Sequence, residues 1–389
     1  MAIAITGATG LLGTRLLELL ARDHDSIMVL CRAGGAPADE RIVRYLRTSG
    51  RSRQEIEAVA ARIHPVQIEL DKPRLGLDAD RFRSLADSLD AVWHCAASID
   101  LNADTQELNR VNTIGTRRII ELADAGARQP MLHHVSSIGV VGRKPVGRIY
   151  EDDLDSSYGF TTRYEESKYL AEVAVREWSS RTGRPAVVHR PSVLVADQRP
   201  HPDLPAHPLL TGVQLARKLV SSFGVGALAG DSRLVVRIPG DPMSAVNILP
   251  VDEAARLMVA VAEHSPASGV DTYHIVHPQD VPMALMMEVF QELFDDILPL
   301  DLRFVPSAPK SPAPWESLLY QTMSTFLPFI SYRRRFDDRR LRELGLTGAH
   351  TAAVDREYLM RCLGGPAHAT STPVQRDPGH ESLAHVTMG

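Results

Sequence analysis

The chain has 389 residues, of which 44% are apolar and 23% charged, which is ordinary for a globular protein with a sizeable core. Its formal net charge is −5, from 43 Lys and Arg against 48 Asp and Glu, and this balance argues against nucleic acid as a partner. Three cysteines without paired or metal-binding spacing (Cys31, Cys95, Cys362), no secretory signal and no apolar run long enough for a membrane span favour a cytoplasmic protein without a disulfide framework.

The first half of the chain alternates short apolar runs with amphipathic segments. The runs predict strands at Ala2–Ile5, Ser26–Leu30, His64–Leu70, Ala91–Cys95, Met131–Ser136 and Ala186–Arg190. Apolar residues near a 3.6-residue period predict helices at Leu11–Arg22, Arg53–Arg62, Thr113–Ala125 and Tyr164–Arg181. Such alternation predicts an α/β fold with a doubly wound parallel sheet of the Rossmann type over residues 1–192.

The pattern changes after residue 192, and a proline-rich stretch occupies residues 199–208. Isolated elements follow, predicted at Val213–Ser222, Leu234–Ile238, Asp252–Glu263, Thr272–Val276 and Ala284–Leu293. We expect residues 193–364 to form a smaller, mainly helical domain that could also complete the Rossmann sheet. The apolar segment Trp315–Ile330 is expected to be buried core, with a hydrophobic docking face as the alternative, and residues 365–389 are expected to form a flexible tail.

A glycine-rich turn follows the first strand immediately and opens the first helix. Gly7 permits a tight turn, Gly10 lets the backbone approach a pyrophosphate, and Gly13 allows helix and strand to pack closely. The free amide groups at the helix N-terminus favour the phosphates. The stretch Thr6-Gly7-Ala8-Thr9-Gly10-Leu11-Leu12-Gly13 therefore predicts a dinucleotide site.

The end of the second strand indicates which nucleotide binds. Enzymes that use NAD typically place an acid there to bind the ribose 2′-hydroxyl, whereas this chain has Cys31 followed by Arg32. A guanidinium group suits a 2′-phosphate, so NADPH is the predicted cofactor. Arg41 could add a second positive charge, and a solvated surface position remains an equal alternative for it.

A candidate catalytic group lies further along the chain. Tyr164 and Lys168 are four residues apart in a predicted helix and therefore share one face. An ammonium group near a phenol favours the phenolate and so promotes proton exchange with a substrate. Ser136 and Ser137 end a strand at the edge of the sheet where ligands bind, and Ser137 could stabilise negative charge on the reacting oxygen. No histidine forms a helix-spaced pair with a carboxylate, so no metal site is expected.

In this order the motifs resemble those of extended short-chain dehydrogenases. They are Thr6–Gly13, His94–Ser98, Asn112–Thr116, Ser136–Gly142, Tyr164–Lys168 and Arg190–Ser192. Within that group the chain is similar to the thioester reductase and fatty acyl-CoA reductase branch, through Leu75-Gly76-Leu77, Ala96–Asp100, Tyr164–Glu172 and Asn247–Asp252.

The resemblance implies roles for single residues. Ser137, Tyr164 and Lys168 would be catalytic, and Glu69 would replace the acid that usually contacts the adenine. The remaining cofactor-binding positions implied are Leu70, Ala96, Ala97, Ser98, Asn112, Ser136, Pro191, Ser192 and Val193, beside the glycine-rich turn, Arg32 and Arg41.

The function expected from the resemblance is NADPH-dependent reduction of an acyl thioester, on a carrier protein or coenzyme A, to an aldehyde or alcohol. Residues 193–364 would bind the substrate, and Arg143, Lys144, Arg148 and Arg333–Arg335 could attract its acidic carrier. Two alternatives remain open. The same residues could serve a dehydrogenase, reductase or epimerase of a free ketone, steroid or nucleotide sugar, or the chain could be a non-catalytic NADP-sensing regulator.

Overall fold

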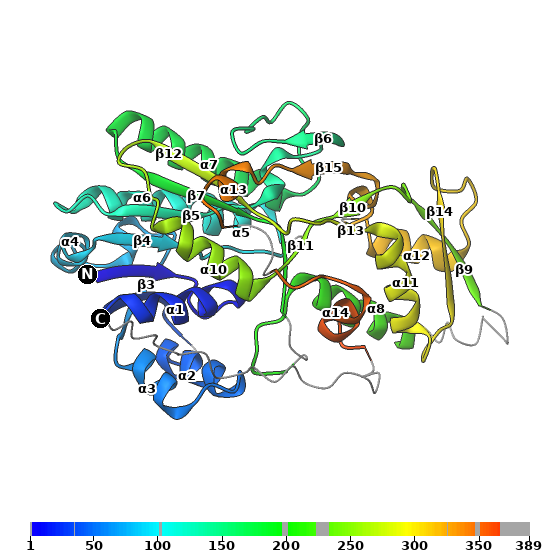
Figure 1. The fold of residues 1–389 in the computed structure, drawn as a ribbon, viewed down its shortest axis with the longest axis horizontal. Helices are drawn as coiled ribbons and strands as arrows, with labels where there is room; N and C mark the ends of the chain where they lie inside the picture. The colour runs from blue at the N-terminus through cyan, green and yellow to red at the C-terminus, as the bar shows by residue number, and fades with distance from the viewer. Residues whose placement is uncertain are drawn as a thin grey trace, which may run out of the picture.

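A seven-stranded parallel sheet forms the centre of the molecule (Figure 1). The computed structural model describes residues 2–34, 36–100, 103–196, 201–222, 233–324, 326–346 and 351–365. The strands follow the order β12-β7-β5-β4-β1-β2-β3. Their bounds are β1 Ala2–Thr6, β2 Ser26–Arg32, β3 Ile63–Ile68, β4 Ala91–His94, β5 Met131–Val135, β7 Ala186–Pro191 and β12 Val270–Ile275. The order reverses beside β1, which places the predicted glycine-rich turn at the topological switch point of the sheet.

Two apolar layers cover the sheet, because side chains alternate between its faces along each strand. Ile3 and Ile5 of β1 pack with α1 (Leu11–Asp23), α2 (Ala38–Thr48) and α10 (Val251–Ala262). Ala4 faces the other layer, which contains α4 (Ala79–Ser88), α6 (Gly115–Ala125) and α7 (Arg163–Thr182). The predicted Rossmann architecture is confirmed, although α2 and α4 were missing from the elements expected from sequence.

The second half of the chain contributes to this sheet. β12 pairs in parallel with β7, from Val270 beside Ala186 to Ile275 beside Pro191. α10 packs against α1 in the same apolar layer. We therefore propose that the dinucleotide-binding unit comprises residues 1–192 together with α10 and β12.

The other C-terminal elements form a separate body beside the carboxyl edge of the sheet (Figure 1). They include α8 (Pro208–Ser222), β9 (Leu234–Pro239), α11 (Met283–Phe294), β14 (Leu300–Val305), α12 (Pro314–Thr322), the 3₁₀ helix η4 (Leu327–Ser331) and α14 (Arg356–Cys362). β9 and β14 pair in parallel, and β15 (Arg333–Phe336) returns to pair with β6 (Val146–Ile149). Residues 199–200 of the proline-rich stretch and 366–389 of the expected tail lie outside the described residues.

The segment Trp315–Ile330 differs from its prediction. It was expected to be buried core, yet Trp315, Leu319 and Phe326 are only half-buried, and η4 contains no buried residue. These side chains line a cavity instead. The segment is apolar because it forms the wall of a cavity that is open to a ligand.

A buried ion pair joins α7 to the sheet. Glu172 on α7 and Arg190 on β7 are both 0% exposed, and Arg190 Nη2 lies 2.7 Å from Glu172 Oε1. Burial opposes ionisation of Glu172, but Arg190, Arg176 and the Ser136 hydroxyl outweigh it and lower the pKa of Glu172 from its ordinary 4.5 to about 2. The stabilisation from this carboxylate is therefore present at neutral pH and is lost as the pH falls from about 4.5 towards 2.

We expect Arg190→Met to lower the free energy of unfolding at neutral pH by about 3–5 kcal/mol, because it leaves Glu172 buried with part of its compensating charge removed. Denaturant unfolding measures this loss. The control is Arg53→Met, which breaks the solvent-exposed Arg53–Glu57 pair and should change stability little. Equal free energies of unfolding for the two variants would show that the buried pair contributes no more to stability than the exposed Arg53–Glu57 pair.

Candidate active site

The glycine-rich turn forms a cradle between β1 and α1. Gly7 has φ +72°, and a Cβ atom there would lie 2.8 Å from the amide nitrogen of Ala96. A Cβ atom on Gly13 would lie 2.0 Å from the carbonyl oxygen of Gly7. Gly10 caps α1 without a side chain, so the first turn of the helix presents its backbone to the cavity. These restrictions fit a pyrophosphate held at the helix N-terminus.

Thr6 fastens the cradle to the neighbouring strand. Its hydroxyl accepts hydrogen bonds from the amides of Cys95 (3.1 Å) and Ala96 (3.0 Å), and it bonds His94 Nδ1 at 2.9 Å. Ala96, Ala97 and Ser98 consequently line the cavity beside the glycine-rich turn. Thr6 thus positions the loop in addition to lining the site, a role that the sequence did not indicate.

The rim that was expected to face the adenosine carries Arg32, Arg41 and Glu69. All three side chains are exposed and line the cavity. Within the described part of the chain, neither guanidinium group forms a hydrogen bond or an ion pair, although the Arg41 amide donates to the Pro37 carbonyl at 3.1 Å. Glu69 is held by a left-handed turn, in which its amide donates to the carbonyl of Leu75 at 2.9 Å and Leu75 has φ +57°. The charged groups at this rim are therefore available to a nucleotide.

Asn112 differs from the other predicted cofactor residues, because it does not line the cavity. It is buried in the π-helical turn η2 (Asn109–Ile114). Its Oδ1 accepts from the Ser98 amide at 2.8 Å, and its Nδ2 donates to the Ser98 carbonyl (3.0 Å) and to Ser167 Oγ (2.9 Å). Asn112 therefore holds the loop after β4 against α7, and its predicted contact with the cofactor is not supported.

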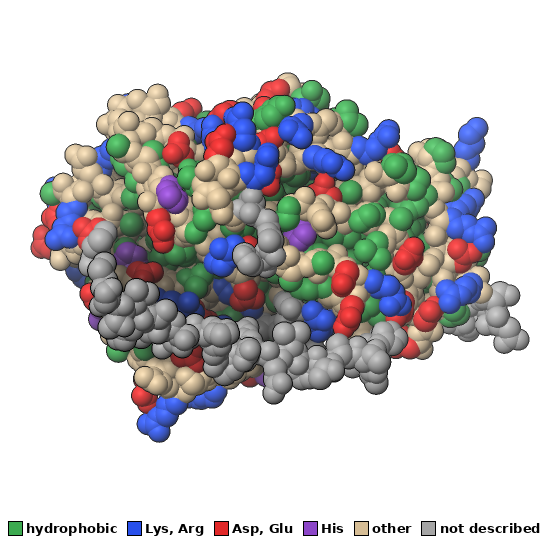
Figure 2. Space-filling model, viewed as in Figure 1, with side chains coloured by type: hydrophobic (Ala, Val, Ile, Leu, Met, Phe, Trp, Pro, Cys, Tyr) green, Lys and Arg blue, Asp and Glu red, His purple; other side chains and the backbone are tan. Residues whose placement is uncertain are grey.

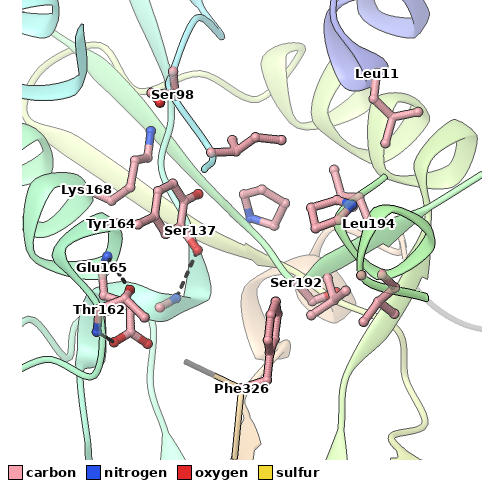
Figure 3. Close-up of a pocket in the computed structure, with 18 of the residues that line it drawn as sticks. Leu11, Ser98, Ser137, Thr162, Tyr164, Glu165, Lys168, Ser192, Leu194 and Phe326 are labelled. Atoms are coloured by element: carbon pink, nitrogen blue, oxygen red, sulfur yellow. Dashed lines mark hydrogen bonds between the residues drawn. The ribbon is translucent and has the colours of Figure 1, made fainter. Parts of the chain in front are cut away.

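Ser137, Tyr164 and Lys168 meet on the wall of the cavity (Figure 3). Ser137 follows β5, while the other two lie one turn apart on α7, which begins with a capping box between Thr162 and Glu165. The Ser137 hydroxyl lies beside Tyr164 (Figure 3) and accepts from the Gly139 amide at 3.0 Å. Lys168 Nζ donates to the Val135 carbonyl at 2.6 Å. Ser192, Leu194 and Phe326 lie across the cavity from them.

Burial controls the protonation of this group. It raises the pKa of Tyr164 to about 12, despite the opposing hydrogen bond from Ser137. It also lowers the pKa of Lys168 to about 8. Lys168 is not among the groups that shift the pKa of Tyr164, so burial determines this pKa and the expected effect of the ammonium group is not found. At neutral pH Tyr164 carries its proton and is suited to act as an acid.

Of the predicted site residues, all except Asn112 line one continuous cavity of about 1170 Å³. Ser136 is among them, but its hydroxyl donates to Glu172 at 2.7 Å and so supports the network beneath the site. Pro191, Ser192 and Val193 lead from the sheet into the C-terminal body. The cavity then continues between the C-terminal elements, where sequence reasoning named no site residue. Apolar residues at helical spacing on α11 were the available signal.

A parallel sheet with a glycine cradle at its switch point and a Ser-Tyr-Lys group at the same edge defines a nucleotide-dependent enzyme of the short-chain dehydrogenase class. The family model described as Male sterility protein matches residues 5–258, and the chain belongs to this family. The predictions of an extended short-chain dehydrogenase fold and of an NAD(P)-dependent oxidoreductase are thereby confirmed.

Curated relatives are much longer proteins. A linear gramicidin synthase polypeptide of Brevibacillus parabrevis is 32% identical over 284 residues, which are 71% of this chain and 5% of that protein. The carboxylic acid reductase of Mycobacterium tuberculosis is 28% identical over 305 residues, or 72% of this chain and 24% of the reductase. The chain therefore spans only a small part of these relatives.

Solved structures share the whole architecture. The terminal R domain of the myxalamid PKS-NRPS pathway aligns with a TM-score of 0.70 and 27% identity, covering 93% of this chain and 89% of that domain. The reductase domain of a nonribosomal peptide synthetase from Mycobacterium tuberculosis aligns with a TM-score of 0.64 and 20% identity over 93% and 90% of the two chains, and shares the fold.

Arg32 generates a prediction about cofactor choice. We expect NADPH to bind more tightly than NADH, and Arg32→Ala to narrow the difference by about 1–3 kcal/mol, the scale of a charge-assisted hydrogen bond. Titration calorimetry with both nucleotides measures this. The control is Arg44→Ala, an exposed arginine on α2 outside the cavity. Equal affinity of the unmodified protein for the two nucleotides would refute the role of Arg32.

Tyr164 generates a prediction about catalysis. Tyr164→Phe removes the acidic hydroxyl with little change in volume, so turnover should fall by roughly 10²–10⁴-fold while nucleotide binding persists. Tyr169→Phe is the matched control on the same helix, since Tyr169 packs against Phe160 outside the cavity. Steady-state rates and nucleotide titrations should separate the variants. Near-normal turnover without the Tyr164 hydroxyl would exclude it as the proton donor.

Proposed function

We propose that this chain is an NADPH-dependent reductase of acyl thioesters, which releases an aldehyde or, after a second reduction, an alcohol. The observation that carries the proposal is the continuous cavity. It begins at the cofactor cradle, passes the Ser-Tyr-Lys group and extends into a compartment on the far side. A cofactor and an extended substrate could therefore meet at Tyr164. The relatives named as a carboxylic acid reductase and as R domains support the same reaction class.

The residues present fit the cofactor. The cradle from Thr6 to Gly13 would hold its pyrophosphate, Arg32 and Arg41 its 2′-phosphate, and Lys168 its nicotinamide ribose. When bound, NADPH supplies a hydride to the thioester carbonyl carbon. Every further step can be assigned to groups of this chain or of the substrate.

Ser137 and Tyr164 would bind the thioester carbonyl oxygen. As the carbon is reduced, negative charge develops on this oxygen, and the two hydroxyls stabilise it. Tyr164, protonated because its pKa is raised to about 12, donates its proton and gives a thiohemiacetal. The C–S bond then breaks as the hydroxyl proton is lost and the departing sulfur is protonated, so that a thiol leaves and the oxygen becomes the carbonyl of an aldehyde.

The carrier of the acyl group would dock at the basic surface. Lys and Arg side chains gather over β6 and β15 (Figure 2). Arg335 is 85% exposed, with Asp280 at 3.9 Å, while Arg148 and Arg333 pair with Asp337 and Asp241. Arg334 is instead buried and donates to the Gly142 carbonyl at 2.6 Å. We infer that Arg335 contributes most to attraction of an acidic carrier protein or coenzyme A.

The proposal predicts that a carrier-bound or coenzyme A thioester is reduced faster than the same acyl group on a minimal thiol. The advantage should shrink with rising ionic strength, because exposed charges are screened beyond about 8–10 Å. NADPH consumption and aldehyde trapping measure the rates. Arg335→Glu should reduce the advantage, whereas Arg53→Glu on α3 (Arg53–Ala60), with a side chain 92% exposed, should not. Efficient turnover of a free ketone with every thioester inert would instead favour the small-molecule alternative.

A further inference from the structure

The compartment beyond Tyr164 is lined by one face of each element that surrounds it. On α11 the lining residues lie at positions i, i+3, i+4, i+7 and i+11, which is one stripe of an α-helix. These residues are Met283, Met286, Met287, Phe290 and Phe294. Flexible methionine side chains suit a wall that adapts to the shape of a ligand.

The other walls of the compartment are also formed by one apolar face of each element. α8 contributes Leu209, Gly212, Val213, Ala216 and Val220, again at helical spacing. The paired strands contribute alternate residues, Leu234, Val236 and Ile238 from β9 with Leu300 and Leu302 from β14. α12 and the segment after it add Trp315, Leu319, Met323, Phe326 and Leu327.

Charge is confined to the end of this compartment nearest the catalytic group. Among the described C-terminal residues that line the cavity, Arg334 is the one with a charged side chain. Its guanidinium group is 4.4 Å from the ring centroid of Tyr332 and donates to the Gly142 carbonyl. Glu165 and Lys168, on α7 beside Tyr164, are the further titratable groups at this end. A polar or charged chain passing further would lose water without gaining ionic partners there.

We propose that this compartment binds the acyl group of the substrate and that the group is a long aliphatic chain. The inference rests on the proposed thioester reduction. With the thioester carbonyl at Ser137 and Tyr164, an acyl chain that extends away from the cofactor cradle enters the stripes of α8 and α11. Each buried methylene should raise kcat/KM by roughly fourfold, the factor that corresponds to its transfer from water. A peptidyl chain would instead bury amides that need hydrogen-bond partners.

The test is a series of straight acyl chains of increasing length on one thiol, beside aromatic and peptidyl thioesters. We expect kcat/KM to rise with chain length until the compartment is full, and the peptidyl thioester to be poor. Binding of a non-reducible long-chain thioether, measured without NADPH, should follow the same order. Equal rates for short and long chains, or a preference for the peptidyl substrate, would overturn the inference.

Gly212 offers a direct way to fill the compartment. A Cβ atom there would have nothing within 4 Å, and the residue lies on the lining stripe of α8. Gly212→Phe should lower the ratio of long-chain to short-chain kcat/KM at least tenfold, whereas Gly212→Ala should preserve the ratio. Ala216→Phe should act like Gly212→Phe. Its matched control is Leu215→Phe on the outer face of the helix, where Leu215 is 49% exposed.

The two proposals can fail separately. If no thioester is reduced but the long-chain thioether binds and Gly212→Phe weakens it, thioester reduction is wrong and the compartment is still an aliphatic site. If thioesters are reduced without regard to chain length, and Gly212→Phe changes no ratio, the reductase proposal stands and the aliphatic site is wrong.

Discussion

The buried carboxylate of Glu172 joins the three elements on which the catalytic edge depends. It lies on α7, one turn after Lys168, and accepts the hydroxyl of Ser136, the neighbour of Ser137. It also pairs with Arg190, which precedes Pro191 and Ser192. An ion pair removed from water stabilises a structure only when its hydrogen bonds are satisfied. Here five hydrogen bonds from Ser136, Arg176 and Arg190 reach one carboxylate, so the ends of β5 and β7 and the middle of α7 keep one mutual arrangement.

Burial makes the ionised Glu172–Arg190 pair costly in free energy. Burial also determines the protonation state of the catalytic group. Tyr164 lies where a phenolate is disfavoured, and it therefore keeps its proton. A reductase needs a donor at the carbonyl oxygen, so the raised pKa is useful in the reductive direction. The apolar compartment on the far side of Tyr164 maintains this condition, since its walls offer few groups that would hold water.

Sequence reasoning succeeded where the signal was local. Gly7 and Gly13 follow from the geometry of one turn. Tyr164 and Lys168 share one face of one helix, and they became candidates together with Ser136 and Ser137 upstream and with the family resemblance. It failed where contacts between distant segments decide the outcome. Asn112 carries a motif, but only the fold shows that its amide holds Ser98 and Ser167. An apolar run such as Trp315–Ile330 has the same sequence pattern whether it faces a core or a cavity. The raised pKa of Tyr164 likewise depends on burial, which spacing does not reveal.

The path of the chain explains how the cofactor-binding half of the cavity and the apolar compartment keep their relative position. The chain builds α8 and β9 of the compartment, returns to the sheet for α10 and β12, and leaves again for α11, β14 and α12. It then comes back through β15, which pairs with β6, close to the catalytic edge. The compartment is therefore anchored to the Rossmann sheet at successive crossings. Its lining residues can change without disturbing the sheet, because they lie on elements that pack mainly against one another. Such an arrangement would let one catalytic edge serve different acyl groups in the reaction that we propose.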